Sequence, residues 1–142
     1  MDHESYVAIE TPIGQLRGRD TIFLEQEDYR GEERRFSLHG RIPGEHASRA
    51  HPVWYLFDLT FHGVLALRII ELDSWFHMGL SLVSQSQFDE VLNSSWLSQL
   101  GGKVEPHHRH FSVVTYDDAF DVICERYEMA VRTENGQPVA PA

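Results

Sequence analysis

The feature that most constrains this sequence is the alternation of side chains in residues 54–73. Four apolar side chains occupy every second position of its first half: Tyr55, Phe57, Leu59 and Phe61. A period of two is that of a β-strand with one buried face. Gly63 follows, and glycine adopts the positive φ of a tight turn at no steric cost. Residues 64–72 are apolar again, so the segment predicts a β-hairpin that is covered on both faces.

Shorter alternating runs surround this hairpin and are separated by turn residues. Residues 7–9, 22–24 and 36–42 form three of them, and residues 76–83 form another after the hairpin. Runs of this kind are typical of strands in an antiparallel sheet.

The pattern changes at Ser86 from a strand period to a helix period. Ser86 and Asp89 have the spacing of a capping box, and the apolar residues of 88–100 recur near helical spacing. A helix is therefore expected from this box to Leu100. Residues 117–131 leave two interpretations open, a second helix or an edge strand, because their β-branched content is high.

These elements predict an α+β fold. We expect an antiparallel-rich, curved sheet of about six to seven strands with one or two helices packed against it. The chain has 142 residues, of which 42% are hydrophobic, and this is enough to bury a core in a single domain over residues 1–132. Residues 133–142 have little to bury, so we expect a disordered C-terminal tail.

The charge balance excludes some partners and favours others. There are 22 acidic and 12 basic residues, the net charge is −10, and Lys103 is the single lysine. Direct binding to nucleic acid or to an anionic membrane is therefore not expected, whereas a basic protein partner fits the charge. The sequence has no export signal and no membrane-spanning stretch, and Cys124 is its single cysteine. These features predict a protein of the reducing cytoplasm, and we expect a bacterial-type interaction protein.

A histidine cluster is the sharpest candidate for chemistry. His107, His108 and His110 stand at the start of a predicted strand. On a strand, His108 and His110 point to the same face, as two imidazole ligands of a metal must. The cluster predicts a divalent metal site at His108 and His110, and the alternative is a group of solvent-exposed polar residues.

Two adjacent carboxylates are the candidates for acid and base catalysis. Asp117 and Asp118 follow the predicted strand, and paired carboxyl groups perform proton transfer when one of them is desolvated. The competing interpretation is a helix cap with favourable charges. The common catalytic motifs are absent from the chain, which favours a role other than catalysis.

A short aromatic segment is the candidate for an interface. Trp75, Phe76 and His77 lie beside a predicted turn, and aromatic residues are enriched where proteins meet.

Three hypotheses for function follow. The first is a small acidic protein-binding module, such as an inhibitor, an immunity-type protein or a regulatory protein. The second is a metal-binding or small-molecule-binding protein, or an enzyme, that uses His108 and His110. The third is a homo-oligomeric accessory protein joined through an apolar edge strand.

Overall fold

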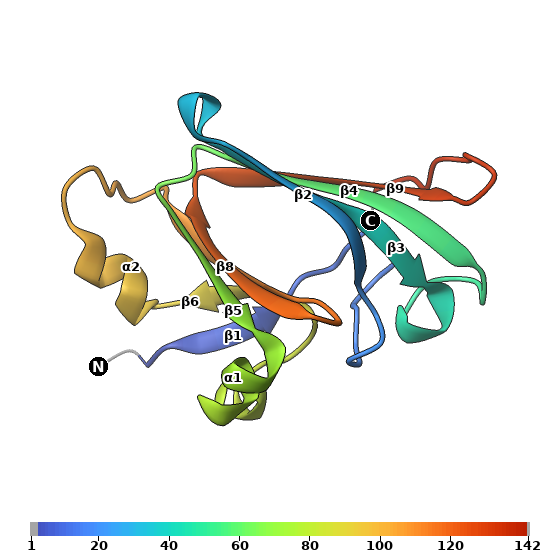
Figure 1. The fold of residues 1–142 in the computed structure, drawn as a ribbon, viewed down its shortest axis with the longest axis horizontal. Helices are drawn as coiled ribbons and strands as arrows, with labels where there is room; N and C mark the ends of the chain where they lie inside the picture. Colours follow the sequence, from blue (N-terminus) through green and yellow to red (C-terminus); the bar gives the residue numbers. More distant parts are fainter. Residues whose placement is uncertain (1–2, 142) are drawn as a thin grey trace.

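The computed structural model describes residues 3–141 and shows two antiparallel β-sheets that pack against each other (Figure 1). The five-stranded sheet contains, in spatial order, β1 (Ser5–Ala8), β6 (Phe88–Leu92), β7 (Arg109–Val114), β8 (Asp118–Cys124) and β5 (Ala66–Glu71). The four-stranded sheet contains β2 (Phe23–Arg30), β3 (Arg35–Pro43), β4 (Trp54–His62) and β9 (Arg126–Thr133). The predicted antiparallel character is confirmed, but the sheet content is larger than predicted.

Helical structure is short and mostly lies beside the five-stranded sheet (Figure 1). The α-helices are α1 (Leu72–His77) and α2 (Ser95–Leu100), and the 3-10 turns are η1 (Gly31–Glu33), η2 (Gly44–His46) and η3 (Leu80–Leu82). Within residues 3–141, no helix has the length and apolar character needed to cross a membrane.

The alternation in β4 is confirmed, but the predicted hairpin is wrong. β4 pairs with β3 and β9, whereas the next strand, β5, pairs with β8 in the other sheet. The bend after Gly63 causes this separation. The Val64 N–H donates to the Arg34 carbonyl beside one sheet, and the Leu65 N–H donates to the Ile123 carbonyl of the other. The chain therefore crosses between the sheets where a hairpin was expected.

Two further elements differ from the sequence-based prediction. Residues 76–83 form the end of α1 and η3, not a strand, because the Glu71 carboxylate accepts hydrogen bonds from the Asp73 and Ser74 N–H groups and starts a helix. The expected helix at residues 86–100 is the strand β6 followed by the short α2. The Ser86 hydroxyl does donate to Asp89, but this contact closes a buried turn before β6.

Residues 117–131 are strand and not helix, but the expected single edge strand is two strands, of which β9 lies at a sheet edge and β8 lies between β7 and β5. They form most of β8 and β9 with Glu125 between them. β8 is buried on both faces, from Ala119 to Cys124, so its sequence reads as a continuous apolar run without alternation. Within the expected tail, residues 134–139 turn back along β9, and the Val139 N–H donates to the Val131 carbonyl.

The outer face of the four-stranded sheet carries paired charges, and no helix covers it in Figure 1. Near its centre Asp58 lies 2.5 Å from His39 Nδ1 and accepts a hydrogen bond from Arg132 Nη1 at 2.8 Å. Partial burial acts to raise the pKa of Asp58, but these two contacts prevail and lower it. The Asp58 carboxylate is therefore paired with side chains of the same outer face.

Aromatic rings from both sheets form the core. Phe61 of β4 lies 5.9 Å from the Phe111 ring of β7 and 6.3 Å from the Phe88 ring of β6, measured between ring centroids. Rings at such separations contribute beyond the area they bury. These contacts fix the spacing between the two sheets.

Replacing Phe61 with alanine tests this packing. We expect Phe61→Ala to lower the free energy of unfolding by about 3–5 kcal/mol, because it removes a fully buried ring and leaves a cavity. Urea denaturation measures the change. Leu82→Ala is the control, since this leucine is 87% exposed and its loss should cost no more than about 0.5 kcal/mol. Equal effects of the two substitutions would contradict the assignment of Phe61 to the core.

Candidate functional site

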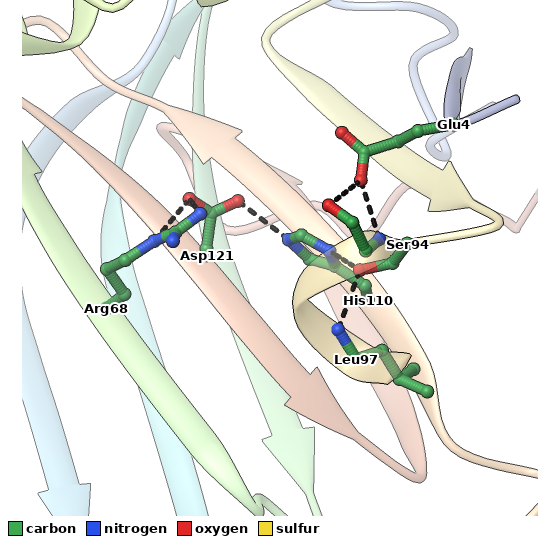
Figure 2. A network of polar contacts seen from close by, with 7 residues as sticks. Glu4, Arg68, Ser94, Leu97, His110 and Asp121 are labelled. Carbon is green, nitrogen blue, oxygen red and sulfur yellow. Dashed lines mark hydrogen bonds and ion pairs between the residues drawn. The ribbon is translucent and has the colours of Figure 1, made fainter. Parts of the chain in front are cut away.

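A chain of polar contacts runs across the outer face of the five-stranded sheet (Figure 2). Arg68 Nη2 donates to Asp121 Oδ2 at 3.0 Å, and Asp121 Oδ1 lies 2.8 Å from His110 Nε2. His110 Nδ1 lies 2.7 Å from the Ser94 hydroxyl oxygen, which accepts a hydrogen bond from the Leu97 N–H. We call these four side chains, Arg68, Asp121, His110 and Ser94, the polar relay.

Strand register and α2 together bury the polar relay except for Arg68, whose side chain is 39% exposed. Arg68 and Asp121 are paired residues of β5 and β8, so their side chains leave the sheet on the same face. Trp96 of α2 covers the relay, with its ring 5.4 Å from the His110 ring and 4.4 Å below the Arg68 guanidinium. Asp121 and His110 are each 3% exposed as a result.

The donor and acceptor roles in the polar relay depend on which nitrogen of His110 carries a proton. An imidazole with its proton on Nε2 donates to Asp121 and accepts the Ser94 hydroxyl proton at Nδ1. Serine, histidine and aspartate follow one another in the same order in the proton relays of serine hydrolases.

The surroundings of Ser94 do not complete such a catalytic site. Its oxygen caps α2 by accepting from Leu97, and the adjacent Ser95 N–H, a potential oxyanion donor, donates to the Glu4 carboxylate at 2.8 Å. The contacts of the relay instead join α2 to β7, β8 and β5. We interpret the polar relay as a structural anchor for α2.

Two ionisable groups of the five-stranded sheet have raised pKa values. Burial, followed by the nearby charges of Asp121 and Glu4, raises the pKa of Tyr6 to about 12. Burial likewise raises the pKa of the Cys124 thiol to about 12. Neither group is ionised near neutral pH, so neither offers an anionic nucleophile there.

Sequence reasoning missed the polar relay because its members are far apart in the chain. One local signal was available. Asp121 interrupts an otherwise apolar run, residues 119–124, and a carboxylate in such a run needs a buried partner. The partner itself, His110, was assigned to a metal.

The structure places the two predicted metal ligands in different surroundings. His110 is buried with both ring nitrogens in contact with protein groups, whereas His108 Nδ1 accepts a hydrogen bond from the Glu105 N–H. The structure brings another set together, since donor atoms of His107, His108 and Glu125 lie within 4.8 Å of one another. Metal binding by His108 and His110 stays a prediction, and these three side chains are better placed to hold an ion.

Of the two predicted catalytic carboxylates, Asp117 lies in the turn between β7 and β8, and Asp118 is the first residue of β8. The Thr115 hydroxyl donates to the Asp118 carbonyl and accepts from the Asp118 N–H, which closes the turn. Partial burial, then the charges of Asp117 and Glu71, raise the pKa of Asp118. These three carboxylates form an acidic group next to α1, because the Leu72 N–H donates to the Asp117 carbonyl.

The predicted interface residues separate into a buried and an exposed part. Trp75 is 4% exposed and packs in a second core cluster with Leu72, Val114 and Ala119. Phe76 is 42% exposed, and His77 is also exposed. The exposed apolar surface continues past α1 into η3. We call it the α1–η3 ridge, and its members are Phe76, Met78, Leu82 and Val83.

Comparison with known proteins finds no relative. No family model, curated protein or solved structure matches the chain significantly. The function therefore has to be argued from the residues of this chain alone.

Loss of Asp121 tests the structural role of the polar relay. We expect Asp121→Ala to lower the free energy of unfolding by about 3 kcal/mol, because Arg68 and buried His110 lose their shared partner. Thermal and urea unfolding measure the loss. Asp20→Ala, at an exposed aspartate, should change stability by no more than about 0.5 kcal/mol. A similarly small effect at Asp121 would overturn the anchoring role.

The acidic group next to α1 predicts a pH-dependent gain in stability. A raised folded-state pKa means that ionised Asp118 destabilises the fold at pH values above that pKa, and that this penalty is absent below the unfolded-state pKa of about 4. Asp118→Asn should therefore raise the melting temperature at pH 7, and the gain should vanish at pH values below the ordinary carboxyl range. Melting curves across pH check this, with Asp20→Asn as the control.

Proposed function

We propose that this chain is a non-catalytic protein-binding module that contacts its partner through the α1–η3 ridge. One observation carries the proposal. Four large apolar side chains within eight residues are exposed: Phe76 by 42%, Met78 by 55%, Leu82 by 87% and Val83 by 45%. Single exposed apolar residues are common on proteins, whereas several large ones in one short segment make that segment a candidate interaction surface.

The α1–η3 ridge has buried residues that hold it on the sheet and exposed side chains that can adjust to a partner. Beneath it, Leu72 and Trp75 are buried against Val114 and Ala119, so the segment is held in place on the five-stranded sheet. Aromatic residues and methionine are enriched at interfaces, and the flexible thioether of Met78 fits irregular surfaces. The ridge is therefore positioned before a partner arrives, which reduces the entropy lost on binding.

Charge next to the ridge indicates a basic partner. Glu71, Asp73, Asp117 and Asp118 all lie at or beside the start of α1, and the whole chain carries a net charge of −10. Negative charge beside an apolar contact accelerates encounter with a positive surface and selects against acidic proteins. An inhibitor, an immunity-type protein or a regulatory subunit acts by covering a partner in this way.

Site-specific photocrosslinking tests the proposal. A photoreactive phenylalanine analogue is placed at Leu82, and at exposed Ala130 on β9 as the matched control, and both proteins are irradiated in extract of the source cells. We expect one basic protein to be crosslinked from Leu82 and not from Ala130. That protein is then purified, and its binding to the wild-type chain is measured by calorimetry at two salt concentrations.

Leu82→Asp supplies the decisive comparison. It should weaken binding of the purified partner by at least about tenfold without changing the melting temperature, because the side chain is exposed in the free protein. Higher salt should also weaken binding. Unchanged binding by Leu82→Asp would overturn the proposal. A crosslink from Leu82 to a second copy of this chain would replace it with self-association.

A further inference from the structure

A pocket of about 290 Å³ lies between the loop at residues 17–19, α1 and residues 84–87. One side is formed by Arg17 and Arg19, which flank Gly18. Gly18 has a φ of +112°, a conformation that L side chains rarely adopt, so glycine allows the turn that places both arginines at the pocket.

The two arginines differ from most others in the protein. Eight of the eleven arginines have a carboxylate oxygen within 4.0 Å in the described part of the chain. Arg17 and Arg19 have none among residues 3–141. Arg17 instead donates to the Gln15 side-chain carbonyl, and Arg19 lies over the Tyr116 ring. In a chain with 22 acidic residues, two arginines on either side of one glycine that both lack a carboxylate contact are unusual.

Two carboxylates next to residues of the pocket accept hydrogen bonds from other donors. The Glu71 oxygens accept hydrogen bonds from the Asp73 and Ser74 N–H groups at the start of α1. The buried Asp89 carboxylate accepts from the Ser86 hydroxyl and the Gln85 N–H. Both carboxylates stabilise local backbone. The backbone hydrogen bonds lower the pKa of Glu71 and the charge of Arg19 adds to this effect, but neither carboxylate places an oxygen within 4.0 Å of Arg17 or Arg19. In the described chain the two guanidinium groups therefore have no direct carboxylate contact and can bind an anionic ligand.

Part of the pocket lining is apolar. Leu72, Trp75, Phe76 and Val114 form this part, and Ser81 and residues 84–87 add polar groups. A ligand that contacted both the arginines and the apolar residues would carry an anionic group for the guanidinium groups and a compact apolar group for the apolar side chains. A volume near 300 Å³ is at the lower end for small-molecule pockets, so the apolar group is limited to about one ring.

We infer that this pocket binds a small organic anion, a carboxylate or phosphate monoester that bears a single ring, with Arg17 and Arg19 holding the anionic group. The inference does not depend on the protein partner proposed above. Phe76 does belong to both surfaces, so a bound anion would order one contact residue of the α1–η3 ridge.

Tryptophan resonances provide a direct assay. The protein has three tryptophans, and Trp75 is the one that lines this pocket. In ¹H–¹⁵N spectra we expect benzoate or phenyl phosphate to shift the Trp75 indole resonance saturably, while neutral benzamide, of similar shape, does not. The tighter of the two anions identifies the anionic group that the pocket prefers.

Arginine variants test the roles of the charges. Arg17→Gln combined with Arg19→Gln should weaken anion binding by at least about tenfold. Arg34→Gln is the matched control, because Arg34 also has no carboxylate within 4.0 Å in the described chain but lines a different pocket. It should leave binding unchanged, as should Leu82→Asp, which alters only the ridge.

Three outcomes would overturn the inference. They are an unshifted Trp75 resonance in the folded wild-type protein with both anions, equal binding of benzamide, and equal weakening by Arg34→Gln. Each of these outcomes concerns the pocket alone. The proposed protein interface is tested separately, by the crosslinking experiment.

Discussion

The contact between phenylalanine rings of the two sheets is the interaction on which the rest of the structure depends. Six phenylalanines are almost completely buried, and they come from β3, β4, β6, β7 and β8: Phe36, Phe57, Phe61, Phe88, Phe111 and Phe120. Neither sheet buries an apolar face unless the other is present. Every surface feature of the molecule is therefore positioned, through the strands, by this layer of rings.

The two outer faces are used differently. The outer face of the four-stranded sheet carries ion pairs, such as the pair between Asp58 and Arg132. The five-stranded sheet carries α1, η3 and α2 over its outer face, and the candidate sites lie there. The polar relay holds α2 to that face, and a cluster around Trp75 holds α1. Burying charged groups under α2 costs desolvation energy, and the paired contacts of Asp121 with Arg68 and His110 offset that cost.

Sequence analysis predicted correctly those elements whose structure follows from the local pattern of apolar and polar residues. Alternation identified β4 correctly, because one face of that strand is buried and the other is not. Alternation could not identify β8, because both faces of this strand are buried and its apolar residues do not alternate with polar ones. The turn at Gly63 was also misinterpreted, because a glycine turn can join two strands of one hairpin or connect strands of different sheets. The Trp75 to His77 segment was found as an aromatic run, but its exposed continuation to Val83 depends on tertiary packing. The polar relay joins residues from four separate segments and has no local spacing to recognise.

The order in which the strands pair has a consequence for folding. Leu59 of β4 pairs with Met129 of β9, near the end of the chain, and β1, near its beginning, pairs with β6. Folds dominated by pairings between distant residues fold slowly, because the entropy of closing long loops is lost before the contacts form. During synthesis the four-stranded sheet lacks its last member until residues 126–133 leave the ribosome. Until then the edge of β4 that pairs with β9 has no partner within this sheet, and an unpaired strand edge can pair with other chains.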